Sequence, residues 1–141
     1  MKIGRYFILL ILVIPVLILR DFTPNNELKY LSIVDEALRD GHFFTFYHQG
    51  ELYADKTPLY FWLLMLSKWI WGEYNMFGLS LFSIIPALIS IYIMNKWVEE
   101  DTTASLRWSG SLMLFTSAFF IGSGLVLRMD MLMCMFILLA L

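Results

Sequence analysis

The chain is poor in cysteine, histidine and charge. Its single cysteine, Cys134, has no partner in the 141 residues, which excludes an internal disulfide framework and a cysteine-based zinc site. The two histidines, His42 and His48, lack a spacing typical of metal ligands. Only 16% of the residues are charged, the net charge is -2, and the Lys and Arg residues are scattered. No basic surface for nucleic acid is present, so we expect no nucleic-acid partner.

Apolar and aromatic side chains are abundant in the chain. The chain is 60% hydrophobic with a mean hydropathy of +0.71, whereas soluble globular domains contain roughly 45–50% apolar residues. Trp and Tyr gather near the ends of the apolar runs, where amphipathic rings suit the lipid headgroup zone. The composition therefore predicts an all-α, polytopic membrane protein with membrane lipids as partners.

Four apolar segments are predicted to be membrane spans. They are residues 5–20, 76–97, 107–127 and 131–141. We expect the first to be an uncleaved helix and not a signal peptide, because residues 20–24 offer no small-residue cleavage site. The last has only about 11 residues where a span needs roughly 20. The chain is therefore predicted to be the truncated N-terminal part of a longer transmembrane domain.

Two further helices are predicted to lie along the membrane surface. Residues 24–40 begin after a potential cap, Thr23, with a proline at the first helical position, and Gly41 ends the helix. Its apolar stripe is narrow and its other face is charged, which favours an interfacial position. Residues 58–71 are too few to span, contain Lys68 and end in tryptophans. The segment between them, His42–Tyr53, is predicted to be irregular, with a turn at Gly50.

These predictions determine the topology. If the N-terminus with Lys2 and Arg5 is cytoplasmic, the first loop is external, and an interfacial helix 58–71 keeps the chain external until residue 76. The next two spans return it to the external side at Arg128 and Asp130. Only in this arrangement do all polar clusters of the chain lie at one membrane face.

Three polar clusters are candidates for chemistry, since ionisable groups near a membrane are costly unless paired, hydrated or functional. Their residues are Asn26, Glu27, Lys29 and Tyr30, then Asp55 and Lys56, then Arg128 and Asp130. Asn26 and Glu27 fit helix capping equally well, Asp55 and Lys56 fit a solvated loop pair, and Arg128 and Asp130 fit an exposed turn. The functional alternatives are a proton-accepting carboxylate at Glu27 or Asp130, lysines that contact a phosphate, and a divalent-cation ligand at Asp55.

The order of these residues resembles a known family. PNNELKY (24–30), GELYADK (50–56), PLYFW (58–62) and LRMD (127–130) are similar to the start of membrane glycosyltransferases of the GT-C class. The nearest resemblance is to the bacterial branch of the dolichyl-phosphate-mannose protein mannosyltransferase family, which includes the aminoarabinose transferase of lipid A. The resemblance covers nearly all of this chain but only the N-terminal part of such an enzyme, and it agrees with interfacial helices in the first external loop.

The resemblance implies roles for the polar residues. The family's Asp-Glu pair, basic residue and tyrosine fall on Asn26, Glu27, Lys29 and Tyr30, so an amide stands at the position of the usual catalytic base. Glu27 or Asp130 would then be catalytic, and Asp55 would bind a divalent metal cation. The substrate-binding residues would be Asn26, Lys29, Tyr30, Lys56 and Arg128.

The expected reaction moves a sugar from a polyprenyl-phosphate-linked donor to a lipid or protein acceptor. It would take place on the external side of a bacterial inner (plasma) membrane that the protein crosses several times. Two alternatives remain open: a transporter or channel fragment whose charges line a path through the bilayer, and a non-catalytic membrane scaffold, which the amide at Asn26 favours.

Overall fold

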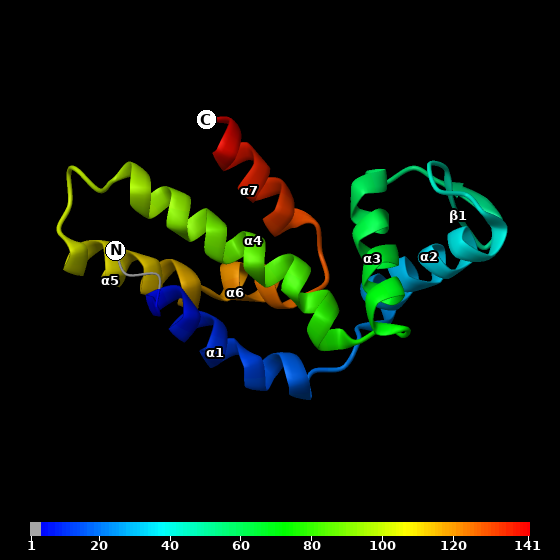
Figure 1. The fold of residues 1–141 in the computed structure, drawn as a ribbon, viewed down its shortest axis with the longest axis horizontal. Coiled ribbons are helices and arrows are strands. Elements are labelled where there is room, and N and C mark those ends of the chain that lie inside the picture. Colours follow the sequence, from blue (N-terminus) through cyan, green and yellow to red (C-terminus); the bar gives the residue numbers. More distant parts are fainter. Residues whose placement is uncertain (1–3) are drawn as a thin grey trace. The chain divides into compact units, whose positions relative to one another are not determined.

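A computed structural model describes residues 4–141, apart from the side chains of Pro24 and Asn25, so that Lys2 lies outside the described residues. The described residues are mostly helical: 73% of them lie in seven α-helices and one π-helical turn, and a small hairpin is also present (Figure 1). The elements are α1 (Gly4–Leu19), η1 (Pro24–Leu28), α2 (Lys29–Asp40), β1 (Phe46–His48), β2 (Glu51–Tyr53), α3 (Pro58–Trp71), α4 (Met76–Trp97), α5 (Ala104–Thr116), α6 (Ala118–Leu125) and α7 (Asp130–Ala140).

The chain divides into two compact units. One unit, called here the helical unit, comprises Met1–Leu19 and Ser80–Leu141. The other, called the loop unit, comprises Arg20–Leu79 and holds η1, α2, the hairpin and α3. The predicted first loop of the protein is therefore a folded unit of its own. The predicted helices 24–40 and 58–71 both lie in it with the expected bounds.

The first helix of the loop unit begins with a wide turn. Pro24 is its first residue, and the N–H groups of Glu27 and Leu28 both donate to the Thr23 carbonyl, so the first turn is π-helical. Gly41 ends α2 in the left-handed conformation with φ 75° and donates its N–H to the Ala37 carbonyl. The predicted start and stop signals are confirmed, although the Thr23 side chain makes no capping bond to the helix.

The segment predicted to be irregular contains a β-hairpin. β1 and β2 pair antiparallel, with Phe46 opposite Tyr53 and His48 opposite Glu51. The two turn residues, Gln49 and Gly50, both have positive φ, 56° and 82°, as a type I′ hairpin turn requires. The turn predicted at Gly50 is confirmed, and the strands beside it are an addition to the all-α fold.

The core of the loop unit lies between α2, α3 and β1. Ile33, Val34, Phe46, Phe61 and Leu64 are buried there, and the Phe46 and Phe61 rings lie 4.4 Å apart. This apolar core packs the hairpin against both helices. The polar residues of the loop unit therefore lie on the surface of a packed structure.

The helical unit buries one face of α1. Tyr6, Leu9, Val13 and Leu17 recur at helical spacing and are buried. The Tyr6 ring meets Tyr92 of α4 edge to face, with 5.8 Å between centroids, so α1 runs beside α4 (Figure 1). The opposite face of α1 is apolar yet exposed. Its exposed residues are Phe7, Ile8, Ile11, Leu12, Val16, Ile18 and Leu19.

The predicted span 107–127 is two helices in the structure. α5 ends at Thr116 and α6 begins at Ala118, with a bend of 67° between them. Ser117 is extended (ψ 134°), and the hydroxyls of Thr116 and Ser117 donate to the carbonyls of Leu112 and Leu114. Such hydroxyls compete with the helix for backbone groups and bend it. Continuity of this predicted helix is thus wrong at Ser117.

Among the described helices, one alone is long and apolar enough to cross a membrane. This helix is α4, with 22 residues. α5 and α6 together would make a second candidate if a bent pair forms one span, while α1 and α7 are shorter apolar helices. The number of membrane crossings predicted from the sequence stays a prediction.

Candidate functional site

Glu27 is fully buried at the start of the loop unit. Its Oε2 accepts hydrogen bonds from the Thr23 N–H at 2.7 Å and the Thr23 hydroxyl at 2.9 Å. The Arg20 guanidinium forms an ion pair with the same oxygen at 2.5 Å. A carboxylate that reaches back to the residue before the helix acts as a cap, and Arg20 neutralises its charge. This geometry favours the capping interpretation of Glu27 over the catalytic one.

Asn26 precedes Glu27 in the chain and lies on the surface. Its side chain is exposed, and its carbonyl accepts the N–H of Lys29, which starts α2. The turn that buries Glu27 therefore directs Asn26 outward. Asn26 remains a predicted substrate contact.

Lys29, Tyr30 and Asp55 gather around one residue that the sequence analysis did not select, Tyr53. The Lys29 Nζ lies 4.5 Å from the centroid of the Tyr53 ring. Tyr30 and Asp55 both act on the Tyr53 hydroxyl, and Asp55 hydrogen-bonds with it. We call these four residues the Tyr53 cluster. It joins the first turn of α2 to the chain just after β2.

The charge state of Tyr53 reflects this environment. Burial raises the pKa of Tyr53 most, and the neighbouring Tyr30 and Asp55 raise it further, to about 12. A carboxylate that accepts a hydrogen bond from a phenol stabilises the neutral phenol. Tyr53 is therefore a neutral hydroxyl donor held against Asp55 at physiological pH.

Lys29 and Lys56 differ from the other cations of the loop unit that the structure describes. In the part of the chain that the structure describes, neither lysine forms an ion pair, whereas Lys68 is paired with Asp35 and Arg39 with Asp40. The partner of Lys29 is an aromatic ring, and a cation over a ring keeps its charge. Both lysines are part-exposed, and Asp55 between them in the sequence is exposed. An anion such as a phosphate can reach them.

Aromatic packing fixes Tyr30. Its ring meets Tyr60 edge to face, with centroids 5.6 Å apart, and Phe61 at 6.3 Å. Tyr53 meets the same Phe61 ring at 6.0 Å. Phe61 is completely buried. The Tyr53 cluster thus stands directly on the core of the loop unit, and its rings have fixed positions.

Two polar contacts hold the rest of the frame. The Glu36 carboxylate accepts the N–H groups of Gln49 and Gly50 at 2.9 and 3.0 Å, which fastens the hairpin turn to α2. Asp35 accepts hydrogen bonds from both Lys68 and the Tyr74 hydroxyl, each at 2.6 Å. Burial, and then Asp35, raise the pKa of Tyr74. These contacts tie α2 to the hairpin and to the end of α3.

A complete metal site is not preformed. Among the described residues, no three His, Cys, Asp or Glu side chains lie together as metal ligands. A cation at Asp55 would therefore depend on water and on substrate oxygens, as is usual for Mg²⁺ bound with a phosphate.

Arg128 and Asp130 belong to the helical unit. Arg128 Nε pairs with Asp130 Oδ2 at 2.6 Å, and both side chains are part-exposed. The Ser83 hydroxyl of α4 donates to the Arg128 carbonyl at 3.2 Å, which fixes the turn between α6 and α7. Asp130 is the first residue of α7, a position that favours a carboxylate. A site that joins this pair to the Tyr53 cluster stays a prediction.

Sequence reasoning missed Arg20 and Tyr53. Tyr53 stands in GELYADK, directly opposite Phe46 in the hairpin. Recognition of the Gln49-Gly50 turn would have predicted this register and placed Tyr53 near the helix that starts at Lys29. No local pattern marks Arg20, which lies seven residues before Glu27.

Comparisons with protein-family models, curated proteins and solved structures find no match to this chain.

Proposed function

We propose that the protein transfers a sugar from a polyprenyl-phosphate-linked donor to a lipid or protein acceptor at the outer face of a bacterial inner membrane. The observation that carries this proposal is the Tyr53 cluster. Three residues predicted from two separate sequence segments to belong to one donor site lie around a single tyrosine. They are Lys29, Tyr30 and Asp55.

The chemistry of the cluster fits a phosphate leaving group. The acceptor oxygen bonds to the anomeric carbon of the sugar, and the bond from that carbon to the phosphate oxygen breaks with its electrons passing to the phosphate. Lys29 and Lys56 offer charge to the departing phosphate, and the Tyr53 hydroxyl holds Asp55 beside them. Asp55 would hold a divalent cation whose remaining ligands are water and phosphate oxygens.

The acceptor loses a proton in this reaction, so the site needs a base. The Glu27 carboxylate is buried, accepts hydrogen bonds from Thr23 and is paired with Arg20. Asp130 has a part-exposed carboxylate and is the stronger candidate. Arg128, its partner, would contact the substrate.

Membrane embedding accounts for the exposed apolar surface of the helical unit. A contiguous apolar patch of this kind is unusual on a soluble monomer, and the outward face of α1 is apolar along its length. The loop unit is different. Its helix α2 carries Asp35, Glu36, Arg39 and Asp40, while exposed Trp62 and Trp69 on α3 suit the headgroup zone. We place the loop unit at the membrane surface.

Transfer itself is the test. Membranes that contain the protein are incubated with a radiolabelled polyprenyl-phosphate sugar, and label is followed into lipid and protein acceptors. We expect transfer by the wild type, and loss of transfer in Lys56→Gln and Asp130→Ala with membrane insertion unchanged. Arg39→Gln is the matched control, since this exposed cation is already neutralised by Asp40. Wild-type turnover in both test variants would overturn the site, and label that crosses the membrane without transfer would indicate a transporter.

A further inference from the structure

The helical unit contains a groove that the proposed transfer does not use. It lies between the C-terminal half of α4 and the facing side of α5, with a volume of about 340 Å³. Its walls are mainly apolar, and polar residues lie at one end. The apolar lining residues are Ile91, Met94, Val98, Leu106, Gly110 and Leu114.

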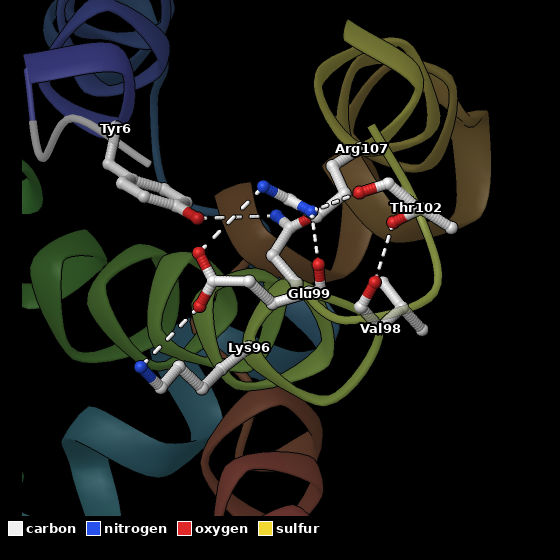
Figure 2. Close-up of polar contacts among 7 residues, drawn as sticks. Tyr6, Lys96, Val98, Glu99, Thr102 and Arg107 are labelled. Atoms are coloured by element: carbon white, nitrogen blue, oxygen red, sulfur yellow. Dashed lines mark hydrogen bonds and ion pairs between the residues drawn. The ribbon is translucent and has the colours of Figure 1, made fainter. Parts of the chain in front are cut away.

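Arg107 stands at the polar end of the groove and is held in place by backbone. Its side chain is 8% exposed, and its Nη1 donates to the carbonyls of Glu99 and Thr102 at 2.9 and 2.5 Å (Figure 2). The carboxylate of Glu99 lies further off, 3.7 Å from Nη2. The guanidinium is therefore fixed in position by neutral carbonyls, while its charge is only loosely paired.

Lys96 and Arg107 both lie beside the Glu99 carboxylate. Lys96 Nζ lies 3.5 Å from its Oε2 (Figure 2). Lys96 is the main cause that lowers the pKa of Glu99, and Arg107 lowers it too. Glu100 and Asp101 follow in the same exposed loop. The polar end thus has cations beside the groove, with Arg5 close by over the Trp108 ring, and carboxylates in the loop beyond it.

The other polar groups along the groove are already satisfied. Asn95 Nδ2 donates to the Ser111 hydroxyl at 2.6 Å and to the Tyr6 hydroxyl at 3.2 Å. The Ser111 hydroxyl in turn donates to the Arg107 carbonyl at 2.8 Å. The body of the groove consequently offers a mainly apolar surface, so a hydrocarbon chain suits it better than a polar ligand.

We propose that this groove binds one phospholipid with an ammonium headgroup, of the phosphatidylethanolamine class. An acyl chain lies along the apolar walls, the phosphate contacts Arg107, and the ammonium contacts the carboxylates of the loop after α4. The inference rests on the membrane placement proposed above and not on sugar transfer.

The position of the groove and its charges select this occupant. α4 is the helix able to span a bilayer, and it ends in Lys96 and Trp97, residue types that settle at headgroup depth. The polar end of the groove begins at this depth. A headgroup with both charges matches an end that contains cations beside the groove and carboxylates in the adjoining loop, whereas a purely anionic headgroup would bring no cation to Glu100 and Asp101.

Filling the groove tests the acyl site. Gly110 lines it, and a Cβ added there meets nothing within 4 Å, so a side chain can start from this position and Gly110→Leu is expected to occupy the groove. Gly122 of α6 has equal space and does not line the groove, so Gly122→Leu is the matched control. Both replace glycine in a helix by a better helix former. Native mass spectrometry of the purified protein with phosphatidylethanolamine is expected to detect one retained lipid in the wild type and Gly122→Leu, and none in Gly110→Leu.

Competition among lipids tests the headgroup. Phosphatidylethanolamine should be retained over phosphatidylcholine and phosphatidylglycerol, and Arg107→Gln should weaken retention about tenfold, the equivalent of one lost charged hydrogen bond. Equal retention by Gly110→Leu and the wild type would overturn the acyl site, and preference for phosphatidylglycerol would overturn the headgroup assignment. The readout needs no sugar donor, so its failure is distinguishable from failure of the proposed transfer.

Discussion

Glu27 accepts two hydrogen bonds from Thr23, one from the backbone N–H at 2.7 Å and one from the hydroxyl at 2.9 Å. The sequence predicted the opposite direction, with Thr23 as the residue that caps the helix. The π-helical first turn explains the difference, because it brings the side chain of Glu27 back over the residue before the helix. Glu27 therefore stabilises the start of the loop unit, with Arg20 as its counter-ion.

Removal of this buried carboxylate should destabilise the protein. Glu27→Ala removes the acceptor of the two Thr23 hydrogen bonds and the carboxylate that pairs with Arg20, and breaking a buried pair typically costs about 3 kcal/mol. Chemical unfolding in detergent micelles measures the loss, with the exposed Glu51→Ala as the control. If Glu27→Ala unfolds like the control yet transfers no sugar, Glu27 is catalytic and the capping interpretation is wrong.

Tyr53 makes stability depend on pH in the alkaline range. An unperturbed tyrosine has a pKa of about 10, and the folded protein raises the pKa of Tyr53 to about 12. Because the folded state keeps a proton that the unfolded state has released, this stabilisation is complete below about pH 10 and is lost as pH rises through the folded pKa. Unfolding curves of Tyr53→Phe should lack that part of the alkaline decline.

Asp55 accounts for part of the Tyr53 shift. In Asp55→Ala the pKa of Tyr53 should fall below about 12 while it remains above its ordinary value, because burial is the largest cause. The absorbance of tyrosinate, compared with that of the Tyr53→Phe variant, isolates this residue from the other tyrosines. An unchanged titration would mean that Asp55 does not contact the Tyr53 hydroxyl.

Tyr74 fastens α2 through Asp35. Tyr74→Phe removes the hydrogen bond of 2.6 Å to the Asp35 carboxylate, which should lower the free energy of unfolding by about 1 kcal/mol, since the carboxylate is half exposed. Tyr47→Phe in the hairpin is the matched control. Equal stability of the two variants would mean that the Tyr74 hydrogen bond to Asp35 does not stabilise the loop unit.

Helix bounds were the most predictable part of the fold, for local reasons. Pro24 and Pro58 open helices and Gly41 ends one, and each acts through its own backbone. The hairpin was missed because its turn is Gln-Gly, in which Gln49 takes a positive φ unusual for a side chain other than Asn, Asp or Gly. The break at Ser117 was missed because apolar periodicity runs on through it.

The site was predictable as residue types and not as contacts. Lys29, Tyr30 and Asp55 were predicted for one site from their residue types and order, and they lie around Tyr53 because the hairpin returns the chain to the start of α2. Their roles stay predictions. The burial of Glu27 depends on Arg20, a partner beyond the helix that no spacing rule connects to it. Tertiary contacts of this kind decide whether a carboxylate is a cap or a base.

Binding of the carrier phosphate by Lys29 is the most direct measurement of the proposed site. Purified protein in micelles is titrated with a fluorescent polyprenyl phosphate, and Lys29→Gln is compared with Arg39→Gln, a cation of the same unit that Asp40 already neutralises. We predict that Lys29→Gln weakens binding about tenfold, as loss of one charged phosphate contact implies, while Arg39→Gln binds like the wild type. Equal affinity of Lys29→Gln and Arg39→Gln would contradict a donor site at the Tyr53 cluster.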